Sequence, residues 1–157
     1  MDMTYSPNLA NGLPDPRTDA EFYSGVPLRR ALAWVIDGVI IIALAVIGVL
    51  VAGLLTLGIA FFFAGFLFML TSFVYRAGFI AVKSATPGMM AMGIEFRTMS
   101  GHKFETRDAL IHTGLYTLVV MSFFGQMLSM ITMIATDYGR GLPDMVLGST
   151  AINRPLE

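Results

Sequence analysis

The sequence predicts an all-α integral membrane protein with three transmembrane helices, of which the first two form a helical hairpin, and a small β-hairpin in a cytoplasmic loop. Two observations predict the membrane class. The 157 residues are 55% hydrophobic and only 13% charged, and the mean hydropathy is +0.71, which is too apolar for a soluble domain of this length. The charged residues also avoid two long stretches of the chain, as a bilayer requires.

Residues 1–28 come before any apolar run and are rich in proline, at Pro7, Pro14, Pro16 and Pro27. This composition is typical of a flexible tail, which we expect in the cytoplasm. It does not predict a cleavable signal peptide, since a charged region followed by a short apolar run is missing. The first membrane helix is therefore expected to serve as the insertion signal.

The first long apolar stretch, residues 31–80, contains only two charged side chains, Asp37 and Arg76. It is about twice the roughly 20 residues that cross a hydrocarbon core of about 30 Å. Backbone groups in lipid need partners within a helix, so the stretch is expected to fold back on itself. The predicted spans are residues 31–53 and 58–80, with a turn between Gly53 and Gly58.

The loop after the second span carries the signals of a β-hairpin. Thr86-Pro87-Gly88 indicates a turn, and polar and apolar residues then alternate over residues 93–98. Ser100-Gly101 and the short run at residues 102–105 complete the predicted hairpin. Thr106 is predicted to cap the next helix, with Asp108 in its first turn.

The second long apolar stretch, residues 109–135, contains no charged side chain. It predicts a third span over residues 111–135, although Gly125 leaves a re-entrant hairpin open as the alternative. The apolar run that follows, up to Ile152, is too short to cross the bilayer and is expected to lie along the surface or fold back over the helices. Residues 153–157 are predicted to be a C-terminal tail.

Lysine and arginine predict the orientation in a cell (inner) membrane, because cytoplasmic loops are enriched in them. They are Arg17, Arg29 and Arg30 before the first span, Arg76, Lys83, Arg97, Lys103 and Arg107 up to the third, and Arg140 and Arg154 after it. The N-terminus and the central loop are therefore predicted to be cytoplasmic. A complete third crossing would put the C-terminus outside.

Asp37 is the most informative position of the first span. It follows Arg30 by seven residues, or roughly 10 Å of helix. A lone carboxylate there costs about 2.5–3.5 kcal/mol, so it should be paired, hydrated or protonated. Its candidate partners are Arg30, Arg76, His112 and Arg140. Asp37 could form a buried ion pair that fixes the helix register, or it could line a polar path and bind a cation or proton.

Other residue types predict no enzyme, cofactor or metal site. Cysteine is absent, and no phosphate-binding loop, nucleophile elbow or zinc motif is present. His112 is expected to be an interfacial hydrogen-bonding residue, and the methionines of the third span are expected to fill gaps between helices rather than bind copper. The net charge of −1 argues against nucleic acid as a partner.

The segment from Arg29 to Asp37 resembles the first helix of the RDD family, which is named for one arginine and two aspartates. The resemblance assigns these three residues to Arg30, Asp37 and Asp144. It extends over residues 29–152 through Thr86-Pro87-Gly88, the segment 93–96 and the closing segment 144–150. Met89 and Pro143 stand where the family often has a basic residue and a histidine.

The resemblance implies a multi-pass membrane protein for which transport of an unidentified ligand, or ion exchange, is suggested. Our first hypothesis is a protein that performs or assists transport, with Arg30 and Asp37 forming a polar centre that Asp144 joins. This requires Asp144 to approach the cytoplasmic half, which a re-entrant third segment would allow. The alternative is a non-catalytic accessory or assembly subunit. The predicted partners are the lipid bilayer and either copies of the chain or a larger membrane complex.

Overall fold

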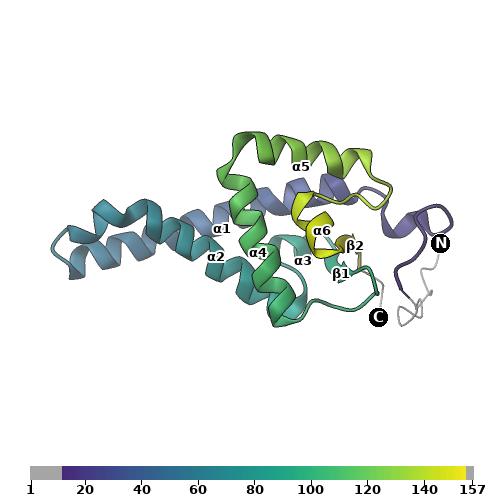
Figure 1. Cartoon of the computed structure of the whole chain (residues 1–157). Coiled ribbons are helices and arrows are strands. Elements are labelled where there is room, and N and C mark those ends of the chain that lie inside the picture. The colour runs from purple at the N-terminus through teal and green to yellow at the C-terminus, as the bar shows by residue number, and fades with distance from the viewer. Residues whose placement is uncertain (1–11, 155–157) are drawn as a thin grey trace.

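The computed structural model describes residues 12–154 and is mostly helical (Figure 1). Helix α1, Val26–Leu55, contains 30 residues, so it is about 45 Å long. A short 3-10 helix, η3 (Ile59–Phe63), leads into α2, Ala64–Lys83. Both long helices are apolar enough to cross a membrane. The predicted helical hairpin is therefore present, and its turn lies where the glycines predicted it.

The hairpin turn is closed by an aromatic ring. A Cβ atom on Gly53 would lie only 2.4 Å from the ring of Phe61, so this position requires glycine. Beyond α4 and α5 the hairpin projects without other elements beside it (Figure 1). Its large side chains there are exposed, for example Leu54 and Phe62.

The buried residues of α1 recur at spacings of four, seven or eight, so they lie on one face of the helix. Its buried positions within the helix are Val26, Ala33, Asp37, Ile41, Ala45 and Gly53. One aspartate therefore lies in a row of otherwise apolar residues that face the rest of the molecule.

The N-terminal segment before α1 packs against the end of the chain. The 3-10 helix η2, Ala20–Phe22, buries Phe22. The Asn153 side-chain amide donates hydrogen bonds to the carbonyl oxygens of Glu21 and Ser24, at 2.7 and 3.0 Å. The predicted flexible tail of residues 1–28 does not fit this part of the chain, and its residues 1–11 lie outside the described residues.

The predicted β-hairpin is only partly present. Strand β1, Ile94–Thr98, forms as the alternation predicted, after the short helix α3, Pro87–Ala91. Its antiparallel partner is β2, Ser149–Asn153, with Phe96 opposite Ala151. Residues 102–105 contribute only the isolated bridge between Arg97 and Lys103. The prediction of a local hairpin partner was wrong because the apolar closing segment offers a longer ladder that covers the core.

The predicted third span is divided into two helices. Helix α4 covers Thr106–Met121 and α5 covers Phe123–Ala135, with a bend of 117° between them. The bend lies at Ser122, whose hydroxyl accepts a hydrogen bond from the Gly125 amide at 3.2 Å and so caps α5. A Cβ on residue 125 would be in tight contact with the Val119 carbonyl oxygen, at 3.2 Å, which favours glycine there. One straight span over residues 111–135 is therefore not formed.

The last helix, α6, covers Leu142–Leu147 and precedes β2. The antiparallel ladder holds the C-terminal strand beside β1, which follows the second long helix. The described N-terminal segment and β2 therefore both lie at the end of the hairpin where α1 begins (Figure 1). The buried apolar core lies at the same end, where Val26, Ile94, Phe96 and Phe104 pack together.

Candidate functional site

The Asp37 centre consists of Asp37 and the four residues around its carboxylate, which are Tyr75, Arg76, Thr86 and Gly88. Asp37 is 1% exposed. Its Oδ1 accepts hydrogen bonds from the Tyr75 hydroxyl at 2.9 Å and the Gly88 amide at 2.8 Å, and its Oδ2 accepts one from the Thr86 hydroxyl at 2.5 Å. Hydrogen bonds to a carboxylate are stronger than neutral ones, which offsets the cost of its burial.

The Thr86-Pro87-Gly88 turn explains how these donors reach Asp37. Thr86 is the N-cap of α3 and accepts a hydrogen bond from the Met89 amide at 3.2 Å, while Pro87 occupies the first helical turn, where its missing N–H costs nothing. Gly88 lets α3 approach α1 closely. A Cβ on Gly88 would lie 2.3 Å from the Ala33 carbonyl oxygen and 2.9 Å from the Asp37 carboxyl carbon.

Arg76 brings the only positive charge that the described residues place beside Asp37. Its Nη1 lies 3.8 Å from Asp37 Oδ2, which is an ion pair without a hydrogen bond. The guanidinium also lies over the ring of Tyr116 on α4, at 4.7 Å from the ring centroid. The Tyr116 hydroxyl in turn accepts a hydrogen bond from Trp34 at 2.7 Å, so the three residues connect α1, α2 and α4.

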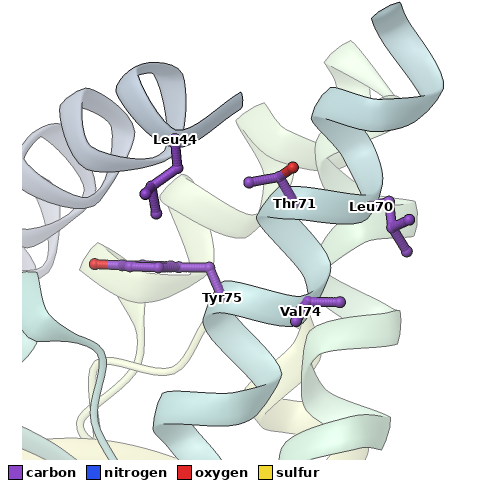
Figure 2. Close-up of a pocket in the computed structure, with 5 residues that line it drawn as sticks. All are labelled: Leu44, Leu70, Thr71, Val74 and Tyr75. Atoms are coloured by element: carbon purple, nitrogen blue, oxygen red, sulfur yellow. The ribbon is translucent and has the colours of Figure 1, made fainter. Parts of the chain in front are cut away.

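An open groove between α1 and α2 ends at the Asp37 centre. It has a volume of about 400 Å³ and is lined by Leu44, Leu70, Thr71, Val74 and Tyr75. In Figure 2, the Tyr75 ring lies below Leu44, and its hydroxyl points away from Leu70 and Val74. Since that hydroxyl donates to Asp37, the Tyr75 ring separates the apolar groove from the buried carboxylate.

The Asp144 centre consists of Arg30, His112, Gly141 and Asp144. The Asp144 carboxylate is fully buried, with Arg30 Nη1 at 2.6 Å, His112 Nε2 at 2.8 Å and the Gly141 amide at 2.9 Å. His112 is itself buried and packs against the rings of Phe96 and Phe104.

The charge of Asp144 is stabilised by its neighbours. Burial by itself raises the pKa of Asp144, but the charge of Arg30 and the hydrogen bond from His112 outweigh burial, so the pKa lies well below its ordinary value. Asp144 is therefore held ionised, and it links α1, α4 and α6.

The structure separates residues that the sequence predicted together. Arg30 and Asp144 do meet, as expected, but Arg30 does not pair with Asp37. The two lie on one face of α1 two turns apart, and Arg30 is held by Asp144 instead. Among the predicted partners of Asp37, Arg76 is the one that the structure places nearby. His112 forms a hydrogen bond, as predicted, but it is buried against Asp144 and the rings of Phe96 and Phe104.

A third buried carboxylate, Glu95 on β1, was not predicted as a site residue. It is 1% exposed and pairs with Arg97 and with Arg154, whose Nε lies 3.3 Å from Glu95 Oε2. Only its spacing of two from Arg97, which places both side chains on one face of a strand, hinted at this ion pair. Among residues 12–154, no group of three or more His, Asp or Glu side chains could hold a metal ion.

A model described as the RDD family matches residues 25–148 of the chain, which is most of its length. The chain belongs to the RDD family. Comparison with curated proteins and with solved structures gave no match. The predicted family is thus confirmed. Of the three residues that the resemblance assigned to the family's arginine and aspartates, Arg30 and Asp144 form one ion pair. The third, Asp37, lies in a separate centre on α1.

Proposed function

We propose that this RDD protein performs or assists the transport of an ion across the cell (inner) membrane, and that Asp37 is the group that exchanges a proton or cation. The observation that supports this proposal is a buried carboxylate in a membrane-spanning helix, surrounded by hydroxyl groups. Intramembrane carboxylates that face a protein interior often mark ion or proton paths. The Tyr75 and Thr86 hydroxyls, at 2.9 and 2.5 Å, can rotate to present oxygen lone pairs to a cation instead of donating to Asp37.

The groove beside Tyr75 is the proposed route by which an ion reaches Asp37. Rotation of the Tyr75 ring would open the groove toward Asp37, because that ring is what lies between them. Arg76 would then neutralise Asp37 after the proton or cation leaves. A single hairpin is too small to enclose a complete path, so the transporting unit is proposed to be an oligomer or a larger complex. No catalytic reaction is part of this proposal.

The proposed topology has two complete crossings, with the N-terminus, the loop before α4 and the C-terminal strand in the cytoplasm. The basic residues support this orientation, because they are concentrated at the start of α1 and from the end of α2 to the start of α4. The pairing of β1 with β2 supports an even number of crossings. The bent pair α4 and α5 is then proposed to enter the bilayer and return on the same side.

Ion flux in vesicles tests the transport proposal. Purified protein is incorporated into vesicles, and proton-coupled flux is measured under sodium, potassium and lithium gradients for the native chain and Asp37→Asn at equal incorporation. We expect flux in the native chain and its loss in the variant. The matched control is Asp137→Asn, an exposed aspartate before α6, which should transport like the native chain. Absence of flux from the native chain under all three gradients contradicts autonomous transport.

A second candidate, an accessory or assembly subunit, is favoured by the projecting half of the hairpin. Large apolar side chains are exposed on both helices there, including Leu50, Leu54, Phe62 and Phe66. A photo-crosslinking residue at Phe62 tests this candidate in intact membranes. A defined heterologous partner of fixed stoichiometry supports it, whereas cross-links to lipid alone contradict it.

A further inference from the structure

Arg76 is a partly buried arginine whose guanidinium donates no hydrogen bond within the described chain. Its side chain is 12% exposed, and a guanidinium has five N–H donors. Arg76 donates no hydrogen bond to any residue of the described chain, and its Nε is buried without a partner. Buried polar groups are normally hydrogen-bonded, so this guanidinium requires an explanation beyond packing.

The ion pair with Asp37 does not account for these donors. Asp37 Oδ2 lies 3.8 Å from Arg76 Nη1, which is too long for a hydrogen bond. Both carboxylate oxygens already accept hydrogen bonds, Oδ1 from Tyr75 and Gly88 and Oδ2 from Thr86. Asp37 is therefore satisfied without Arg76, and the Arg76 donors remain available.

A second orphaned group lies on the helix that faces Arg76. Thr113 on α4 is 1% exposed, and its hydroxyl has no hydrogen-bond partner among the described residues. Thr113 precedes Tyr116 by three residues, so the two share one face of α4. Arg76 lies over the Tyr116 ring, and α2 packs along α4. Thr113 therefore shares with Tyr116 the face of α4 that Arg76 contacts, on the two helices that pack together.

We propose that Arg76 and Thr113 form a binding site for a phosphate group between α2 and α4. The planar guanidinium binds phosphate oxygens with two parallel hydrogen bonds, and the Thr113 hydroxyl supplies a third. Arg76 precedes Lys83 at the end of α2 by seven residues, or roughly 10 Å, which is within reach of the headgroup layer for a long side chain. The phosphate is carried by a lipid headgroup or arrives as a free ion, and the experiment distinguishes these sources.

The Asp37 carboxylate opposes the binding of an anion, but three hydrogen-bond donors point their positive ends at it and partly screen its charge. The stacking of Arg76 on Tyr116 fixes the plane of the guanidinium before a ligand arrives, which lowers the entropy lost on binding. The site shares Arg76 with the Asp37 centre, but phosphate binding is measured without any ion flux, so it can be tested whether or not the chain transports.

Binding is measured on the purified full chain in a detergent that contains no anionic lipid. Phosphatidic acid and inorganic phosphate are the two probes, and phosphatidylcholine controls for lipid in general. Trp34 is the single tryptophan of the chain and donates a hydrogen bond to Tyr116. Its fluorescence therefore reports directly on the site, and thermal unfolding provides a second readout.

We expect saturable fluorescence changes and a higher melting temperature with one or both phosphate probes. Arg76→Gln should lower the affinity by on the order of tenfold to a hundredfold, as expected for lost hydrogen bonds to a charged group. Arg107→Gln, an exposed arginine in the first turn of α4, should bind like the native chain. A response to phosphatidic acid alone identifies the lipid as the source, and a response to both probes identifies the free ion as sufficient.

Thr113→Val makes the test independent of any folding defect in Arg76→Gln. Valine has the shape of threonine, and the Thr113 hydroxyl has no protein partner to lose, so the unliganded variant should unfold at or above the native temperature. Its phosphate affinity should nevertheless fall several-fold. The proposal is overturned if neither probe changes the native chain, or if Thr113→Val and Arg76→Gln both bind like Arg107→Gln. Neither result bears on flux through Asp37.

Discussion

Arg30 Nη1 lies 2.6 Å from Asp144 Oδ2, so the start of the first membrane helix is bound directly to the short helix that precedes the last strand. The ion pair is completed by His112, whose ring packs against those of Phe96 and Phe104. Three elements that are distant in the sequence therefore meet at one carboxylate. All of them lie at the end of the hairpin where α1 begins, so this contact holds α1, α4 and α6 together there.

Removing the Asp144 charge should be strongly destabilising. Asp144→Asn leaves Arg30 buried without its counter-charge, and breaking a buried pair in this way costs about 3–5 kcal/mol. We expect a much lower melting temperature in detergent than for the native chain. Asp137→Asn, an exposed aspartate in the preceding loop, should change it little. Equal melting temperatures for the two variants would contradict a stabilising role for the Asp144 centre.

The same carboxylate should make stability depend on pH. The folded-state pKa of Asp144 is lower than the ordinary value of 3.8, so the unfolded chain binds a proton more readily than the folded one. The stabilisation is therefore complete above about pH 4 and is lost as the pH falls toward the folded-state pKa. Melting temperatures measured from pH 6 to pH 3 should decline for the native chain, and the decline should be smaller for Asp144→Asn.

Gly88 should not tolerate a side chain. In Gly88→Ala the new Cβ would meet the Ala33 carbonyl oxygen at 2.3 Å, so α3 must move away from α1 and weaken its hydrogen bond to Asp37. We expect a loss of about 1–3 kcal/mol in unfolding free energy. Gly114→Ala, on α4, is the matched control because nothing lies within 4 Å of its Cβ position. That variant should be neutral, or more stable by up to about 1 kcal/mol.

The Thr86 side chain should be needed for its oxygen rather than for its shape. Thr86→Val keeps the volume but removes both the hydrogen bond to Asp37 and the cap of α3. A loss of about 2–4 kcal/mol is expected, since a buried carboxylate loses a donor and a helix loses its cap. Thr86→Ser keeps the oxygen and should retain most of the native stability. Chemical denaturation of both variants would show whether serine rescues the site.

Single cysteines can test the proposed topology without background, because the native chain has none. Ser100→Cys and Asp137→Cys should react with a membrane-impermeant thiol reagent only from the cytoplasmic side. Leu57→Cys, at the hairpin tip, where the native side chain is 97% exposed, should react only from the opposite side. Labelling of Asp137→Cys from the same side as Leu57→Cys would instead indicate that α4 and α5 together cross the membrane.

The sequence by itself determined the membrane class, the α1–α2 hairpin and the family. These follow from long uncharged stretches and from Arg30, Asp37 and Asp144, because the length of an apolar run and the cost of a charge in lipid are properties of local sequence. The Thr86-Pro87-Gly88 turn was also visible. The contact that the turn makes was not visible, because three consecutive residues do not indicate that α1, which carries Asp37 51 residues before Gly88, packs against the glycine.

Only the tertiary structure decided how the charges pair and how the chain returns. Arg30 and Asp37 lie on one face of α1, but two turns of helix separate them, and α6 brings Asp144 to Arg30 first. Likewise β1 pairs with the closing segment and not with the neighbouring residues, because that ladder covers the apolar core. Periodicity predicts which face of an element is buried. Which distant segment covers that face depends on the packing of the whole chain.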